Sequence, residues 1–256
     1  MAKSLLRVEN VVKRFGGLIA VDNVSFQVGR GEFIGLIGPN GAGKTTLFNV
    51  VSGVYKPEAG HIYFKDRDIT GLQSHKITRL GIARTFQIPK PFKEMTVLEN
   101  AMVGALFGRR AGKIDVSEAK EIALNSIELV GLRDKADHLA SNLNLHDKKM
   151  LELARALSAE PELLLLDEAL AGLNPREVEE SLQVIERVWR ERDLTIIMVE
   201  HVMHAVMNIA QKIIVLHYGK KIAEGRPEEV AKMSEVITAY LGDPELALKF
   251  VRRREE

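Results

Sequence analysis

The chain of 256 residues contains no cysteine and has no marked excess of either charge. Without cysteine it can form neither disulfides nor thiolate metal sites, which fits a reducing cytosol. Its 36 basic and 35 acidic residues give a net charge of +1, so electrostatics offer no argument for nucleic acid as the main partner. No apolar run approaches the roughly 18 residues of a spanning helix, and the apolar stretch near the start is too short for a signal peptide. We therefore expect any role at a membrane to act through partner proteins.

The most specific signal in the chain is the stretch 38–46. It reads Gly-Pro-Asn-Gly-Ala-Gly-Lys-Thr-Thr and matches the phosphate-binding pattern G-x-x-x-x-G-K-[ST]. The apolar run 33–37 before it indicates a buried strand, and residues 46–51 after it indicate a helix, which is the context that the motif requires. The alternative, a glycine-rich turn that matches by chance, does not predict this context.

The residue types of this loop suit a nucleoside triphosphate. Its glycines let backbone N–H groups converge on phosphate oxygens at a helix N-terminus, where the helix dipole also favours anions. Lys44 is expected to reach the β- and γ-phosphates, and the Thr45 hydroxyl to ligate Mg²⁺. The predicted ATP-binding residues of the loop are Gly38, Pro39, Asn40, Gly41, Ala42, Gly43, Lys44, Thr45 and Thr46.

The N-terminal and middle parts of the chain differ in their pattern. Short β-like runs separated by turn signals indicate a β-rich N-terminal part, with strands at 6–11, 24–28, 33–37 and 61–64. From about Met95 to Ser158 the apolar residues follow helical spacing. Within this helical part, Ser117 is predicted as an N-cap, Gly131 as a helix stop and 108–113 as an exposed loop.

From residue 161 onward, predicted strands alternate with predicted helices. This alternation favours a parallel sheet that is covered by helices. A short helical tail follows, and the basic end of the chain is interpreted as a solvated terminus. The strands are expected at 163–166, 195–199, 213–216 and 221–223.

Polar residues stand directly after two of these strands. Asp167 and Glu168 follow four leucines, so Asp167 is a candidate for contact with Mg²⁺ and Glu168 for the general base that activates water. A strand-terminal Asp-Glu pair is often only surface, and the phosphate-binding loop makes the catalytic interpretation the better one. His201 follows the strand 195–199 and could hydrogen-bond the γ-phosphate and fix the water. His204 and His217 lack such a context and are interpreted as structural.

The order of these motifs resembles the nucleotide-binding subunits of ABC transporters over almost the whole chain. Phe15 precedes the phosphate-binding loop, and Gln87 ends the sequence Arg-Thr-Phe-Gln. After them come a helical insertion, the segment Ala154-Arg-Ala-Leu157, the Asp-Glu pair and His201, in that order. Several further sequence segments are similar to the LivG-type ATPases of branched-chain amino-acid importers. They comprise Phe15-Gly-Gly-Leu, Ala83-Arg-Thr-Phe-Gln87, Glu94-Met-Thr-Val-Leu-Glu-Asn100, Ala171-Gly-Leu-Asn-Pro175 and Val236-Ile-Thr-Ala-Tyr-Leu-Gly242.

The resemblance implies a fold and a division of the chain. The implied fold is α/β: a P-loop NTPase (RecA-like) core with a parallel sheet, an N-terminal antiparallel β part and an inserted α-helical subdomain. The whole chain, 1–256, would be one ABC ATPase domain. Residues 1–94 and 159–242 would form the core, 95–158 the helical signature subdomain, and 243–256 a C-terminal tail.

The resemblance also implies roles for single residues. Phe15 would stack on adenine, for which any aromatic face is suitable, whereas the competing interpretation is a core aromatic. Gln87 would join Thr45 and Asp167 in binding Mg²⁺ or the water, and would act in catalysis with Glu168 and His201. The segment 88–92 and Met95 would help to receive the membrane subunits. The alternative for that segment is a proline-rigidified loop that packs on the helical subdomain.

The chain departs from the family pattern at the signature motif. Where relatives have Leu-Ser-Gly-Gly-Gln, ungapped counting gives Leu143-Asn-Leu-His-Asp147. In the family this motif contacts the γ-phosphate bound by the other subunit, so His146 in place of a glycine threatens close approach. Asn144 and Asp147 also fit an ordinary N-cap pair. Ala169 where proline is usual and Asn174 where aspartate is common are milder departures, and Asn174-Pro175 is also a good helix start.

The resemblance implies the function and its partners. The chain would bind ATP and Mg²⁺ and hydrolyse ATP to power amino-acid import, expected for branched-chain amino acids, through two separate transmembrane permease subunits. It would lie peripherally at the cytoplasmic face of the cell membrane. Its altered signature predicts a heterodimer with a second ABC ATPase subunit whose signature is intact, and a solute-binding protein would be an indirect partner. Two alternatives remain open: a soluble ABC ATPase without a transport role, and a regulatory ATP-binding subunit with weak hydrolysis.

Overall fold

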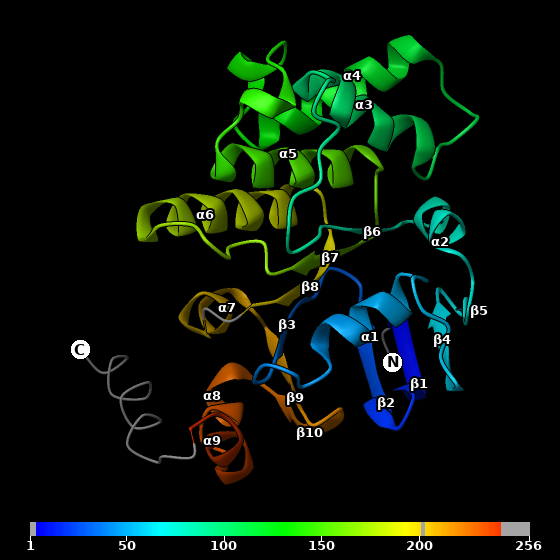
Figure 1. Ribbon diagram of the computed structural model, residues 1–256, viewed down its shortest axis with the longest axis vertical. Helices are drawn as coiled ribbons and strands as arrows, with labels where there is room; N and C mark the ends of the chain where they lie inside the picture. Colours follow the sequence, from blue (N-terminus) through cyan, green and yellow to red (C-terminus); the bar gives the residue numbers. More distant parts are fainter. Residues whose placement is uncertain (1–3, 201–202, 242–256) are drawn as a thin grey trace. The chain divides into compact units, whose positions relative to one another are not determined.

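The computed structural model describes residues 4–200 and 203–241, and the chain forms two compact units. The first unit comprises Met1–Val51, Tyr55–Gly71 and Ile197–Glu256, and the second comprises Ser52–Val54 and Leu72–Ile196. Figure 1 labels their helices and strands. Among the helices of the described residues, none is long and apolar enough to cross a bilayer.

An antiparallel sheet opens the first unit. Its strands are β1 (Ser4–Phe15), β2 (Leu18–Gly29), β4 (Ala59–Phe64) and β5 (Arg67–Asp68), in the order β2-β1-β4-β5. Val24, Phe26 and Val28 of β2 are buried and alternate with more exposed residues, because one face of the sheet covers the core. The three strands predicted at 6–11, 24–28 and 61–64 are confirmed, each inside a longer strand.

The first unit also contains β3 (Phe33–Ile37), which pairs in parallel with β9 (Lys212–His217). β9 pairs antiparallel with β10 (Lys220–Gly225). All five residues of β3 are buried, as is typical of a parallel strand that is covered on both faces. A Cβ on Gly35 would lie 2.3 Å from Val206, so helix α7 (Met203–Ile209) packs directly on this strand. The other helices among the described residues of this unit are α1 (Lys44–Val51), α8 (Pro227–Val230) and α9 (Ser234–Leu241).

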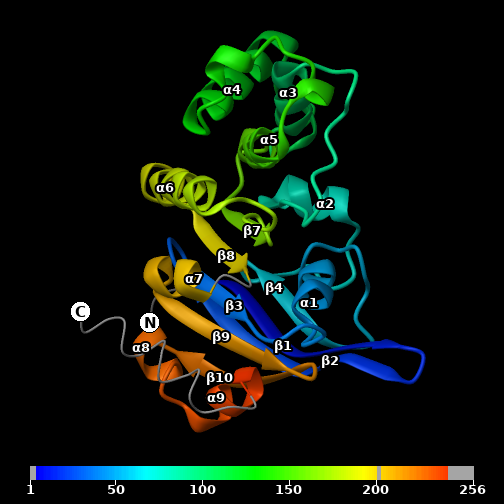
Figure 2. The same cartoon turned by 60° about the vertical axis from the view of Figure 1, so that its left-hand side comes forward.

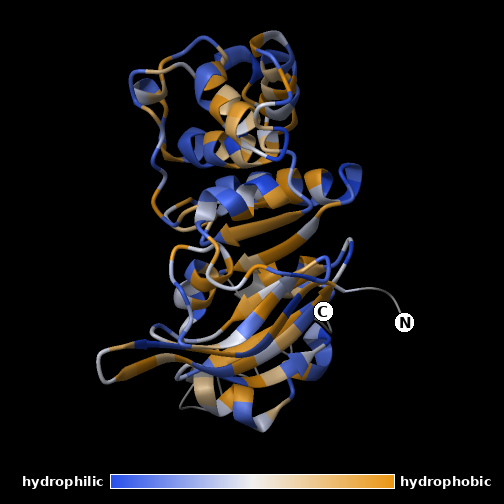
Figure 3. Cartoon of the chain, turned by 90° about the vertical axis from the view of Figure 1, so that its right-hand side faces the viewer, coloured by the Kyte–Doolittle hydropathy of each residue, from blue (hydrophilic) through white to orange (hydrophobic). Residues whose placement is uncertain are grey.

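In the second unit, β6 (Ile82–Arg84) and β7 (Leu163–Asp167) pair in parallel. The next strand along the chain, β8 (Thr195–Val199), contains the point where the chain passes from the second unit to the first. Both β7 and β8 are buried throughout, and both were predicted from their apolar runs. Figure 3 shows β7 and β8 largely in the orange of hydrophobic residues, whereas the helices and the long strands of the antiparallel sheet mix orange with blue. Helix α6 (Pro175–Glu191) turns its apolar residues Ile185 and Val188 to the core.

Three helices of the second unit, α3 (Val97–Phe107), α4 (Val116–Leu129) and α5 (Leu145–Ser158), lie together in Figure 2. The helical spacing predicted from 95 to 158 is thus confirmed. The N-cap prediction is wrong: α4 is capped by Asp115, whose Oδ1 accepts the Glu118 N–H at 2.8 Å, and Ser117 lies inside the helix. The stop is confirmed, because Gly131 follows the helix with a left-handed φ of +74°.

Two short elements, β6 and α2 (Ser74–Leu80), were not predicted. The strand β6 has three residues and directly follows Gly81, the C-cap of α2, which has a φ of +109°. Runs this short carry too little periodicity to be recognised.

The loop 108–113 is exposed or half-buried except at Gly108. Gly108 is buried because it lies close to Ala159: a Cβ on Gly108 would lie 2.5 Å from the Ala159 Cα.

Candidate functional site

The phosphate-binding loop of the first unit connects β3 to α1. Gly38, Gly41 and Gly43 have φ values of +154°, +77° and +99°, which residues with a side chain rarely adopt. Two of these glycines are also in close contact with neighbouring strands. A Cβ on Gly38 would lie 2.2 Å from the Leu216 carbonyl oxygen, and one on Gly43 would lie 2.2 Å from the Ala20 carbonyl oxygen. The loop therefore has a backbone that favours glycine at all three positions, and at 38 and 43 it also leaves no room for a Cβ.

Lys44 is folded back into this loop. Its Nζ donates to the Gly38 carbonyl at 2.6 Å and to the Pro39 carbonyl at 3.0 Å, and the residue is buried. Thr45, Asn40 and Gly41 are exposed, whereas Thr46 is half-buried. A lysine in a glycine-rich loop at a helix N-terminus is the arrangement that binds phosphate.

Phe15 is at the end of β1 in the same unit, and it is not a core residue. Its side chain is 43% exposed and meets Tyr55 edge-on, with ring centroids 5.2 Å apart. The Lys13 Nζ lies 5.2 Å from the Phe15 ring and is paired with Glu58 at 2.7 Å. The pKa of Glu58 is lowered, first by its hydrogen bond from Lys13 and then by the backbone N–H of Arg14. An exposed aromatic ring of this kind is suitable for stacking on a base.

Asp167 ends β7 in the second unit, as predicted, and it is fully buried. The sequence did not reveal its partner. Arg84, from β6, donates to Asp167 Oδ2 at 2.6 Å and to the Ser52 hydroxyl at 3.0 Å. The side chains of the ion pair are 6% and 2% exposed, so the carboxylate charge is neutralised inside the protein.

Glu168 and Gln87 lie together in this unit. The Gln87 Nε2 donates to Glu168 Oε2 at 2.6 Å. Glu168 is buried and has a left-handed φ of +49°, a strained conformation that is common at functional sites. The Lys149 Nζ donates to its carbonyl oxygen at 3.0 Å. The predicted trio of Gln87, Asp167 and Glu168 is thus gathered at the end of β7.

Other predicted residues fall elsewhere. His201 lies outside the described residues. In the signature segment, the Asn144 Oδ1 accepts the Asp147 N–H at 2.8 Å, so the N-cap interpretation is confirmed. The Asp147 carboxylate pairs with Lys135 at 2.7 Å, and the Nε2 of His146 is buried without a hydrogen bond to any described residue. Asn174 also caps its helix, in a reciprocal box with Glu177.

Comparison with known proteins decides the family. Residues 21–171 match the family model described as ABC transporter, and 220–245 match that of the branched-chain amino acid ATP-binding cassette transporter. The chain belongs to the ABC transporter family. It is 42% identical over 254 residues to the high-affinity branched-chain amino acid transport ATP-binding protein LivG of Salmonella typhimurium, covering 95% of this chain and all of that one. BraF of Pseudomonas aeruginosa is 39% identical over the same shares.

Solved structures agree with this membership. A nucleotide-free ATP-binding cassette from an ABC transporter matches with a TM-score of 0.83 and 34% identity, over 94% of this chain and all of that one. The ADP conformation of such a cassette matches with the same score and identity, over 94% and 99%. The predicted fold class and the resemblance to LivG-type ATPases are thereby confirmed. The protein is an ABC transporter ATPase, which binds ATP and couples its hydrolysis to transport.

Sequence reasoning missed three charged residues that contact the predicted ones. Arg84 belongs to the motif Ala83-Arg-Thr-Phe-Gln87, but nothing in the order of residues links it to Asp167, 83 positions away. Lys149 and Glu152 lie in α5, and their buried charges are visible only once the helix is placed. For Arg84 and Glu152 the available signal was a single charge in an otherwise apolar stretch. Lys149 directly follows Asp147 and Lys148, so the sequence offered no such signal for it.

Proposed function

We propose that this chain is the ATP-hydrolysing subunit of an importer for branched-chain amino acids. The observation that carries hydrolysis is the contact of 2.6 Å between Gln87 and Glu168, two groups that can orient and deprotonate a water, at the end of a buried strand. The similarity to LivG and BraF, both branched-chain amino acid transport ATP-binding proteins, supports the solute class. Family membership supports the coupling to transport.

In the proposed reaction, a water oxygen attacks the γ-phosphorus as the bond to the β-phosphate oxygen breaks and ADP leaves. Glu168 takes the proton of the attacking water, while Gln87 and His201 hold that water and the γ-phosphate. Lys44 and the loop N–H groups stabilise the charge that develops on the phosphate oxygens. Phe15 stacks on the adenine.

The donor groups fit Mg²⁺. Thr45, Gln87 and Asp167 offer a hydroxyl, an amide oxygen and a carboxylate. Arg84 holds Oδ2 of Asp167, and Gln87 contacts Glu168 through its amide nitrogen and not its oxygen. Mg²⁺ usually binds proteins through one or two carboxylates and completes its shell with substrate phosphates and water. When bound, the ion would neutralise the phosphate charge and orient the nucleotide.

We further propose the partners and place of this subunit. Two transmembrane permease subunits would bind it at the cytoplasmic face of the cell membrane, and a solute-binding protein would act indirectly. The altered signature at 143–147, where Asn144 and Asp147 serve as a helix cap, supports a heterodimer with a second ATPase subunit of intact signature. We also propose that the core comprises residues 1–94 and 159–242 and that the helical subdomain comprises residues 95–158. The tail 243–256 lies outside the described residues.

Purification of the chain alone and with its permeases and second ATPase from membranes tests this function. ATP hydrolysis and uptake of labelled leucine would be measured in reconstituted vesicles. Glu168→Gln should keep ATP binding and lower hydrolysis by about 10²–10⁴-fold. Glu179→Gln, on the exposed side of α6, is the matched control and should change neither.

The outcomes separate the candidate functions. Hydrolysis without permeases in the complex would favour the soluble ATPase. Unchanged hydrolysis in Glu168→Gln would reject Glu168 as the base and favour the regulatory subunit. Vigorous cooperative turnover by the chain as a homodimer would overturn the proposed heterodimer.

A further inference from the structure

Helix α5 carries three charged residues at a spacing of three: Lys149, Glu152 and Arg155. Residues at this spacing lie on neighbouring parts of one helix face. Lys149 and Glu152 are each only 5% exposed, although they carry charges. Buried charges need partners, and the partners of all three include groups outside α5.

Glu152 and Arg155 hold the loop that contains Gln87. The Glu152 carboxylate accepts the Phe86 N–H at 3.1 Å and the Lys90 N–H at 3.4 Å. Arg155 donates to the Lys90 carbonyl at 3.2 Å and to the Glu152 carboxylate at 3.3 Å. Gln87 therefore lies between two residues whose backbones are fixed to α5.

Lys149 binds the backbone of Glu168, the residue that Gln87 contacts. Its Nζ donates to the Glu168 carbonyl at 3.0 Å in a buried environment. This bond supports the strained backbone of Glu168, whose carboxylate accepts the Gln87 amide at 2.6 Å. One helix thus binds both segments that form the Gln87–Glu168 contact.

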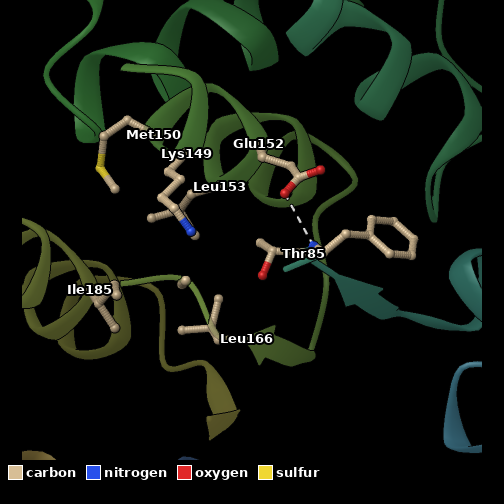
Figure 4. Close-up of a pocket in the computed structure, with 9 residues that line it drawn as sticks. Thr85, Lys149, Met150, Glu152, Leu153, Leu166 and Ile185 are labelled. Atoms are coloured by element: carbon tan, nitrogen blue, oxygen red, sulfur yellow. Dashed lines mark hydrogen bonds between the residues drawn. The ribbon is translucent and has the colours of Figure 1, made fainter. Parts of the chain in front are cut away.

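Figure 4 shows the ammonium of Lys149 and the carboxylate of Glu152 projecting from α5 toward the same side, where Thr85 and Leu166 lie. The lining around them is otherwise mostly apolar, with Met150, Leu153 and Ile185 among its members. Burial raises the pKa of Glu152, against the effect of the Phe86 N–H and Arg155. Electrostatic and hydrogen-bond interactions act more strongly in such surroundings than in water.

We propose that Lys149 and Glu152 are positioning residues for ATP hydrolysis: from α5 they set the distance and orientation of Gln87 relative to Glu168. The inference rests on the proposed role of these two groups at the attacking water. A general base and its water must be held close to the productive geometry, and a displacement of about 1 Å can lower a rate about 10²-fold.

The test compares Lys149→Met, Glu152→Ala and Glu152→Gln in the full complex. The first two should lower kcat by about 10–100-fold with KM for ATP within about twofold, because the changed residues orient catalytic groups and do not touch the nucleotide. Glu152→Gln keeps one acceptor oxygen and should be intermediate. Lys148→Met and Glu128→Gln, at more exposed positions on α5 and α4, are the matched controls and should keep the wild-type values.

A second readout is independent of turnover. Hydrogen exchange of the Phe86 and Lys90 amides should become faster in Glu152→Ala and stay slow in Lys149→Met, because only Glu152 accepts those N–H groups. A merely structural role would lower the thermal midpoint of both variants without this separation. A variant that fails to fold is replaced by Glu152→Gln or Lys149→Arg.

The inference is overturned by unchanged kcat in both variants of an active complex, or by amide exchange that does not distinguish them. Absence of hydrolysis in the wild-type complex would instead refute the proposed function. In that case the exchange experiment still decides whether Glu152 fixes the Gln87 loop.

Discussion

Alanine substitutions at Gly41 and Gly43 compare two glycines of the phosphate-binding loop that share a left-handed backbone but differ in their surroundings. A Cβ on Gly41 meets nothing within 4 Å, whereas one on Gly43 would lie 2.2 Å from the Ala20 carbonyl oxygen. Both variants bear the cost of an alanine at positive φ, about 1–2 kcal/mol. Gly43→Ala must in addition displace backbone by roughly 1 Å, and overpacking of this kind costs about 1–3 kcal/mol.

We therefore expect Gly43→Ala to be less stable than Gly41→Ala by about 1–3 kcal/mol, or by about 2–12 °C in the midpoint of thermal unfolding. Circular dichroism during heating and urea titration, without nucleotide, measures the difference. Omitting nucleotide removes any contact of the new methyl groups with phosphate. Equal losses in the two variants would refute the reasoning that close packing against β2, and not φ alone, requires glycine at position 43.

Three further predictions concern stability. Arg84→Met should lower the free energy of unfolding by about 3–5 kcal/mol, because Asp167 then keeps a buried charge without its ion-pair partner Arg84. Adding Asp167→Asn should recover most of this loss, as measured by urea unfolding. A double variant that is as unstable as Arg84→Met would contradict the prediction. Asn174→Ala removes the cap of α6 and should lower the free energy of unfolding by about 1 kcal/mol, whereas Asn174→Ser keeps a capping oxygen and should not. Equal unfolding midpoints for these two variants would argue against the cap. The raised pKa of Glu152 means that its stabilising contribution is full below its ordinary value of 4.5 and is lost as pH rises through the folded value. Relative to Glu152→Gln, the wild type should therefore lose stability as pH rises above 4.5, and urea midpoints that change in parallel with pH would contradict this prediction.

Much of the fold was predictable because its signals are local. The strands β3, β7 and β8 each contain at least four consecutive apolar or glycine residues. The helix starts at Asn144 and Asn174 follow from side chains that bond to the backbone three residues ahead. The error at α4 had a local cause as well: Asp115 and Ser117 are both good caps, and only the backbone shows which one accepts an N–H group. β6 was missed because three residues carry no periodicity.

The sequence by itself determined the ligand, the family and the identity of the catalytic candidates, because the residues of the phosphate-binding loop and of the Asp-Glu pair are adjacent along the chain. Only the tertiary structure decided what holds those candidates in place. Arg84 reaches Asp167 across 83 positions, and Glu152 reaches the Phe86 N–H across 66. Such pairs form because burial removes water from every charge and thereby selects whichever partner the packing brings near, a choice that the order of residues does not record.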